Sequence, residues 1–319
     1  MLNEKTARGI GDARVEIAYE TLGNPAYPAV LLITGLTARM DYWPAGFLQA
    51  LLDRRLRVIC FDNRDAGHSM HLDHPPSPDL LLARAGNHSS AFNNLSNMAS
   101  DTVRILDFLG IDSAHVVGTS MGSAIAQVMA LEYPGRVRSL TSMMPTAGDM
   151  STRQMHSETK AALLEKEEIT TRESSIERAV RTAPIIRSPA YPTAPAKLAR
   201  VAGLARSQDN DQGAIGRQAV ALIAPEDRVD KLGNIAIPTL IMHGPQDTVC
   251  NVSGGRATAA AIPGAEHVLI EGMGHDLAPG LWGSIADYIA TMVYRSESVR
   301  FRRRRTAQRS YYALRHSRS

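Results

Sequence analysis

The sequence predicts an α/β protein in which a mostly parallel central sheet is flanked by helices. Two stretches, Ala29–Ile33 and Arg57–Phe61, are continuous apolar runs, the pattern of strands buried on both faces of a parallel sheet. Segments with helical spacing separate these runs from the strands that follow. Such alternation of strand and helix is typical of a sheet built with right-handed crossovers.

Each element is predicted from its own stretch of sequence. Alternating apolar and polar residues at 14–19 indicate an early antiparallel strand, and Gly110 and Pro134 mark the ends of two helices. The other expected strands are 114–119, 137–142, 238–242 and 266–270, and the expected helices are 44–52, 98–109, 121–133, 255–261 and 281–294.

The alternation breaks between residues 146 and 230. This stretch has many charged residues and helix formers, helix-breaking prolines at 184, 189, 192 and 195, and no convincing strand. Because strands resume at residue 238, we interpret 146–230 as a helical lid inserted into a single sheet. Residues 1–145 and 231–294 then form the core around that sheet.

Positive charge is concentrated near the C-terminal end. Residues 295–319 hold nine arginines and one glutamate, a net charge of +8, so the total of +3 leaves −5 on residues 1–294. The mildly acidic body has no electrostatic reason to bind nucleic acid or an anionic membrane. We expect the basic tail, 295–319, to be a disordered, solvated extension; the alternative is a contact with phosphates through its arginines and tyrosines.

Other bulk properties point to a cytoplasmic protein. Cys60 and Cys250 lie far apart and suggest no disulfide framework. The first residues lack the apolar run of a signal peptide. No stretch reaches the roughly 18 apolar residues that a membrane span requires.

One serine lies at an abrupt junction between a predicted strand and a predicted helix. Ser120 is flanked by Gly118 and Gly122, two positions away on either side. So tight a turn forces its central residue into unfavourable backbone angles and leaves no room for flanking side chains. It also lifts the hydroxyl clear of the sheet, toward the unpaired N–H groups at the start of the helix. Ser120 is therefore a candidate nucleophile.

A serine hydroxyl needs a base and an orienting carboxylate before it becomes nucleophilic. Asp247 and His275 each follow a predicted strand, so the carboxyl edge of the sheet can bring both close to Ser120. Asp149 is a less favoured choice for the acid, and Asp276 is expected to point elsewhere. The order Ser120, Asp247, His275 predicts a nucleophile, an acid and a base.

The reaction of such a serine also needs two donors for the negative oxygen of its intermediate. We expect the backbone N–H groups of Leu36 and Met121 to supply them, because each lies directly after a predicted strand end. Trp43, Met143 and Met144 are candidates to line an apolar substrate pocket, although each could equally be a core residue.

Together these motifs resemble the α/β-hydrolase superfamily along residues 10–294. The resemblance rests on five stretches: 34–36, 61–69, 118–122, 243–247 and 272–275. Within the superfamily, the turn at 61–69 and the serine junction are similar to the aclacinomycin methylesterase type, which hydrolyses a carboxylic methyl ester on a polyketide. Ser123 departs from the glycine that is common after the junction, so the helix is expected to pack slightly differently there.

The resemblance implies a serine esterase that requires neither a metal nor an organic cofactor and acts on a small or medium apolar ester. Among enzymes, the alternative is a C–C bond hydrolase or an acyltransferase that uses the same three residues. A non-catalytic ligand-binding protein on this fold is less favoured, because all three residues are present.

Overall fold

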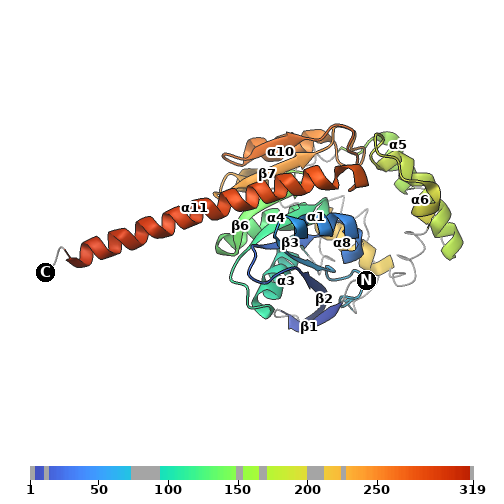
Figure 1. Cartoon of the computed structure of the whole chain (residues 1–319). Coiled ribbons are helices and arrows are strands. Elements are labelled where there is room, and N and C mark those ends of the chain that lie inside the picture. The colour runs from blue at the N-terminus through green and yellow to red at the C-terminus, as the bar shows by residue number, and fades with distance from the viewer. Residues whose placement is uncertain are drawn as a thin grey trace.

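The computed structural model describes residues 4–10, 14–72, 94–148, 154–164, 171–199, 212–223 and 228–316. Within them lies one eight-stranded sheet with the order β1-β2-β4-β3-β5-β6-β7-β8 (Figure 1). The strands are β1 (Lys5–Ile10), β2 (Val15–Leu22), β3 (Ala29–Ile33), β4 (Arg57–Phe61), β5 (Ala114–Thr119), β6 (Val137–Met143), β7 (Thr239–His243) and β8 (Glu266–Leu269).

The sheet is antiparallel at one edge and parallel elsewhere. β2 pairs antiparallel with β1 and with β4, whereas β4, β3, β5, β6, β7 and β8 run parallel. The predicted mostly parallel sheet is confirmed. β1 was not expected, because its short polar sequence carries no strong strand pattern.

Helices cover both faces of the sheet and give it two apolar layers. The first layer includes α3 (Leu95–Phe108), α4 (Met121–Glu132) and α10 (Val252–Ala261), and the second includes α1 (Ala45–Asp53) and the first part of α11 (Trp282–His316). Alternate residues of β3 belong to different layers: Leu31 and Ile33 to the first, Val30 and Leu32 to the second. This double burial explains why β3 is a continuous apolar run.

The segment between β6 and β7 is helical in its described parts, which contain no strand. Its helices are α5 (Ser157–Leu164), α6 (Arg172–Ile186), α8 (Gln212–Ile223) and α9 (Val229–Leu232). β6 and β7 are nevertheless neighbours in the sheet. The segment is therefore an insertion between two adjacent strands, and we call residues 146–230 the insertion from here on.

The last helix is longer than predicted. The sequence analysis ended it at residue 294 and expected disorder beyond, whereas α11 continues to His316. Figure 1 shows α11 crossing the body and then projecting away from the sheet. The physical reason is that no proline or glycine follows Gly283 and arginine is a good helix former. No helix in the described part of the chain is long and apolar enough to cross a membrane.

Candidate active site

Ser120 occupies a strained turn between β5 and α4. Its backbone angles are φ 53° and ψ −120°, a region that residues with a β-carbon rarely adopt. A β-carbon at Gly118 would lie 2.1 Å from the carbonyl oxygen of Gly122, and one at Gly122 would lie 2.2 Å from that of Ile33. The two glycines are thus required by close backbone contact, as the sequence predicted, and the serine side chain stays partly exposed.

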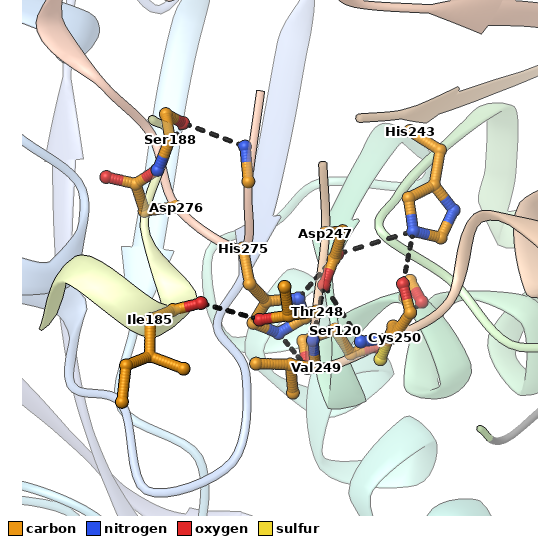
Figure 2. A network of polar contacts seen from close by, with 12 residues as sticks. Ser120, Ile185, Ser188, His243, Asp247, Thr248, Val249, Cys250, His275 and Asp276 are labelled. Atoms are coloured by element: carbon orange, nitrogen blue, oxygen red, sulfur yellow. Dashed lines mark hydrogen bonds and ion pairs between the residues drawn. The ribbon is translucent and has the colours of Figure 1, made fainter. Parts of the chain in front are cut away.

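The three residues that the sequence singled out for nucleophile, base and acid lie in hydrogen-bond contact (Figure 2). Nε2 of His275 is 3.1 Å from Oγ of Ser120, and Nδ1 of His275 is 2.7 Å from Oδ2 of Asp247. The side chain of Asp247 is fully buried and that of His275 is 15% exposed. A proton can therefore pass between Ser120 and an imidazole whose other nitrogen faces a carboxylate.

The carboxylate of Asp247 is held on both oxygens. Oδ1 accepts from the backbone N–H groups of Val249 and Cys250, at 2.9 and 2.8 Å. Oδ2 lies near His275 and also 3.3 Å from Nε2 of His243. Burial alone would raise the pKa of Asp247, but the charge of His275 and the hydrogen bonds from both histidines outweigh it and lower the pKa below its usual range. The acid is thus ionised at neutral pH.

The two expected oxyanion donors belong to the segments that adjoin Ser120. Met121 is the first residue of α4, and the N–H of a first helical residue has no partner within its own helix. Leu36 follows Gly35, where an added β-carbon would lie 3.2 Å from Cβ of Ser120. The turn after β3 therefore lies directly against Ser120.

Two polar side chains support this turn, and sequence reasoning gave neither a role. Nδ2 of Asn63 donates to the carbonyl oxygen of Thr34 at 3.2 Å. From α8 of the insertion, Gln218 accepts from the backbone N–H of Thr37 at 2.8 Å and donates to the carbonyl oxygen of Arg64 at 2.8 Å. Asn63 belongs to the quoted 61–69 motif, whereas nothing in the sequence around Gln218 indicates such a contact.

The three candidate pocket residues lie in the core. Trp43, Met143 and Met144 are 1%, 0% and 0% exposed and belong to the second apolar layer. The carbonyl oxygen of Met143 accepts from the N–H of Ser120 at 3.0 Å. The sequence could not separate a core residue from a pocket residue, because both are apolar.

Tyr42 is a further residue near the site that sequence reasoning missed. Burial and then the carboxylate of Asp276 raise the pKa of the Tyr42 phenol above its usual range, and Asp247 adds to this effect. The phenol is therefore protonated at neutral pH and close to the charged groups of the site. Its position in the short 3-10 helix Met40–Tyr42 carries no sequence signal of that proximity.

The alternative acids have different positions. Asp276 is 5% exposed and contacts Ser188 and Arg187, so it does point away from the imidazole of His275, as expected. Asp149 lies outside the described residues. Across the ranges that the structure describes, no three His, Cys, Asp or Glu side chains form a group that could hold a metal ion.

Comparison with known proteins adds three likenesses. Rhodomycin D methylesterase DnrP of Streptomyces peucetius is 29% identical over 295 residues, which cover 85% of this chain and 92% of that protein. Monoacylglycerol lipase ABHD6 of Bos taurus is 24% identical over 287 residues, 82% of this chain and 74% of that protein. The structure of the meta-cleavage product hydrolase CumD of Pseudomonas fluorescens IP01 matches with a TM-score of 0.70 and 21% identity, over 90% of this chain and 99% of that one.

The methylesterase likeness that the sequence motifs predicted is confirmed by the first of these relatives. The family model for the alpha/beta hydrolase fold matches residues 28–278. This range contains β3 to β8, Ser120, Asp247 and His275. Since the match covers well over half of the sequence, the chain belongs to the α/β-hydrolase fold family.

Proposed function

We propose that this protein is a serine hydrolase that cleaves carboxylic esters through an acyl-enzyme intermediate. The observation that carries the proposal is the continuous hydrogen-bond chain from Ser120 through His275 to Asp247, with distances of 3.1 and 2.7 Å. This chain has the components that convert a weakly nucleophilic hydroxyl into a nucleophile. The methylesterase and lipase relatives support an ester as the substrate.

In the proposed mechanism, Oγ of Ser120 attacks the ester carbonyl carbon while Nε2 of His275 takes the hydroxyl proton. Asp247 stabilises the resulting imidazolium and keeps Nδ1 protonated. The N–H groups of Leu36 and Met121 donate to the negative oxygen of the tetrahedral intermediate. His275 then returns the proton to the departing alcohol, and a water molecule, activated in the same way, releases the acid and restores Ser120.

The substrate class that we propose is a small or medium apolar ester, with a polyketide methyl ester as the specific candidate. Support for the methyl ester comes from the rhodomycin D methylesterases of two Streptomyces strains, at 29% and 28% identity. We also propose that the insertion, residues 146–230, covers the substrate and acts as a lid. Its position between β6 and β7, and its contacts to loops on both sides of Ser120, support this role.

Replacement of Ser120 by alanine tests the proposal. We expect the rate of ester hydrolysis to fall by on the order of 10⁴-fold or more, because no other group supplies the nucleophile. The assay is the hydrolysis of aryl esters of rising acyl length, with Ser298→Ala on the exposed side of α11 as the control. An unreduced rate in purified Ser120→Ala would overturn the assignment. Activity toward a vinylogous 1,5-diketone but not toward any ester would instead favour C–C bond cleavage.

A further inference from the structure

A short stretch of the insertion lies against both loops that carry the proposed acid and base. At the end of α6, the carbonyl oxygen of Ile185 accepts from Oγ1 of Thr248 at 2.8 Å. The next carbonyl, that of Ile186, accepts from the backbone N–H of His275 at 2.8 Å. Residues 185–188, which we call the brace, therefore contact the loop after β7 and the loop after β8. Figure 2 shows Ile185 and Ser188 beside the chain that carries His275.

Ser188 links the brace to both neighbours of His275. The backbone N–H of Gly274 donates to Oγ of Ser188 at 3.0 Å. The same hydroxyl donates to Oδ1 of Asp276 at 2.5 Å, and the N–H of Ser188 donates to that oxygen at 2.9 Å. The residues before and after His275 are thus fixed by one serine, and the N–H of His275 itself is fixed by Ile186.

Asp276 is a buried carboxylate whose hydrogen bonds and ion pair, within the described residues, come from the brace. Its side chain is 7% exposed, and Oδ2 forms an ion pair with Nε of Arg187 at 3.0 Å. A buried carboxylate is stable only with partners of this kind, because removing it from water without them is costly. Separation of the brace from the loop after β8 would leave Asp276 without these contacts, so the two segments are expected to move together.

The backbones of the brace and of the loop before His275 also pack closely together. A β-carbon at Gly274 would lie 2.6 Å from the carbonyl carbon of Arg187 and 2.8 Å from the nitrogen of Ser188. The brace and the loop before His275 are therefore in direct main-chain contact. Neither can shift toward the other, and the hydrogen bonds of Ser188 and Asp276 oppose a shift apart.

We propose that Ser188 and Asp276 are positioning residues. They hold the loop of His275 in the position where Nε2 of His275 reaches Ser120. The proposal rests on the proposed role of His275 as base. It assigns the brace a function distinct from substrate covering: this part of the insertion is a fixed support of the catalytic histidine. A shift of the histidine by about 1 Å is enough to lower turnover a hundredfold.

The test compares Ser188→Ala and Asp276→Asn with Ser296→Ala. Ser296 is a matched control, because it is a buried serine whose hydroxyl donates to the carbonyl oxygen of Arg138 near the start of β6, away from the site. For Ser188→Ala and Asp276→Asn we expect kcat with an aryl acetate to fall by about 10- to 100-fold with little change in KM. The rate of inactivation by a fluorophosphonate, which reports on Ser120 itself, should fall by a similar factor. Ser296→Ala should lower only the melting temperature.

Hydrogen exchange tests the contact between the brace and the loop of His275 independently of ester hydrolysis. The amides of Gly274 and His275 should exchange roughly tenfold faster in Asp276→Asn than in the wild type. This result is expected even if the wild type hydrolyses no ester, in which case the proposed function fails and the bracing contact stands. The positioning role would be overturned by unchanged exchange. It would also be overturned if Ser188→Ala and Asp276→Asn lost only thermal stability, as Ser296→Ala does.

Discussion

Nε2 of His243 lies 3.3 Å from Oδ2 of Asp247, the same oxygen that His275 contacts at 2.7 Å. His243 is fully buried, and its Nε2 also lies 2.9 Å from the carbonyl oxygen of Cys250. One carboxylate oxygen therefore faces two histidines. The sequence analysis included His243 in a family motif, and the structure shows that it contacts the acid directly.

Replacement of His243 by glutamine is expected to lower ester turnover by about tenfold. The contact to Asp247 stabilises the ionised acid, and loss of a charge-assisted hydrogen bond of about 1.4 kcal/mol corresponds to that factor. His115→Gln is the matched control, because His115 is a buried histidine that contacts Ser139 and Glu297 away from the site. Equal turnover in the two variants would show that His243 is only a packing residue.

Asp247→Asn is expected to reduce turnover by about 10⁴-fold, because an amide favours the wrong tautomer of His275. Asp149 is the alternative acid, and Asp149→Asn should leave turnover nearly unchanged. Steady-state kinetics with an aryl ester measure both. The reverse ranking would assign the acid to the segment after β6.

The pKa of Asp247 predicts how stability depends on pH. Because this pKa is lower in the folded protein than in the unfolded chain, the ionised carboxylate stabilises the fold at every pH above the unfolded value of about 4. That contribution is lost as the pH falls below about 4 toward the folded pKa. The melting temperatures of the wild type and Asp247→Asn should therefore differ by a constant amount above pH ~5 and converge in more acidic buffer. A difference that widens with acidification contradicts the prediction.

Gln218 is predicted to stabilise the oxyanion turn from the insertion. Gln218→Ala removes the contacts to the N–H of Thr37 and the carbonyl oxygen of Arg64, which should let the N–H of Leu36 shift. We expect kcat to fall by about tenfold with KM less affected, since the donor acts mainly on the intermediate. Gln127→Ala, which removes another buried glutamine that contacts Ser142, should leave kcat unchanged. A larger effect of the control would exclude this role for Gln218.

The backbone strain at Ser120 predicts a stability difference between two inactive variants. At φ 53° and ψ −120°, glycine is tolerated and alanine is strained. Ser120→Gly should therefore have a free energy of unfolding about 1 kcal/mol higher than Ser120→Ala, measured by chemical denaturation. An equal or lower value for the glycine variant would mean that the turn relaxes when the hydroxyl is removed.

The sequence predicted most of the parallel sheet because its strands are buried on both faces. β3 and β4 have the predicted boundaries, and the ends of β5, β7 and β8 were close enough to locate Ser120, Asp247 and His275. These positions were predictable since each proposed role requires a local turn of recognisable composition. β1 was missed because pairing with β2, rather than its own short polar sequence, makes it a strand.

Contacts between distant segments were not predictable. Ser188 and Asp276 are 88 residues apart, and Gln218 is 181 residues from Thr37. Nothing in the local sequence of either pair marks its partner, because the pairing depends on where the insertion packs. The roles of Trp43, Met143 and Met144 were open for the same reason: hydrophobicity predicts burial but not whether a buried residue faces a pocket.

The projecting end of α11 is predicted to contribute little to ester turnover or thermal stability. Between Ile285 and Val293 the helix packs in the second apolar layer, and Glu297 still contacts the body through His115 and Arg138, at 3.2 and 3.0 Å. The contacts described for α11 thus come from residues before 302. Deletion of residues 302–319 should leave ester turnover and the melting temperature nearly unchanged, because it removes none of these contacts and reduces the net positive charge of the chain. Enzyme assays and thermal unfolding of the shortened chain measure both quantities. A large drop in either would show that the arginine-rich end packs against the body and contributes to its stability.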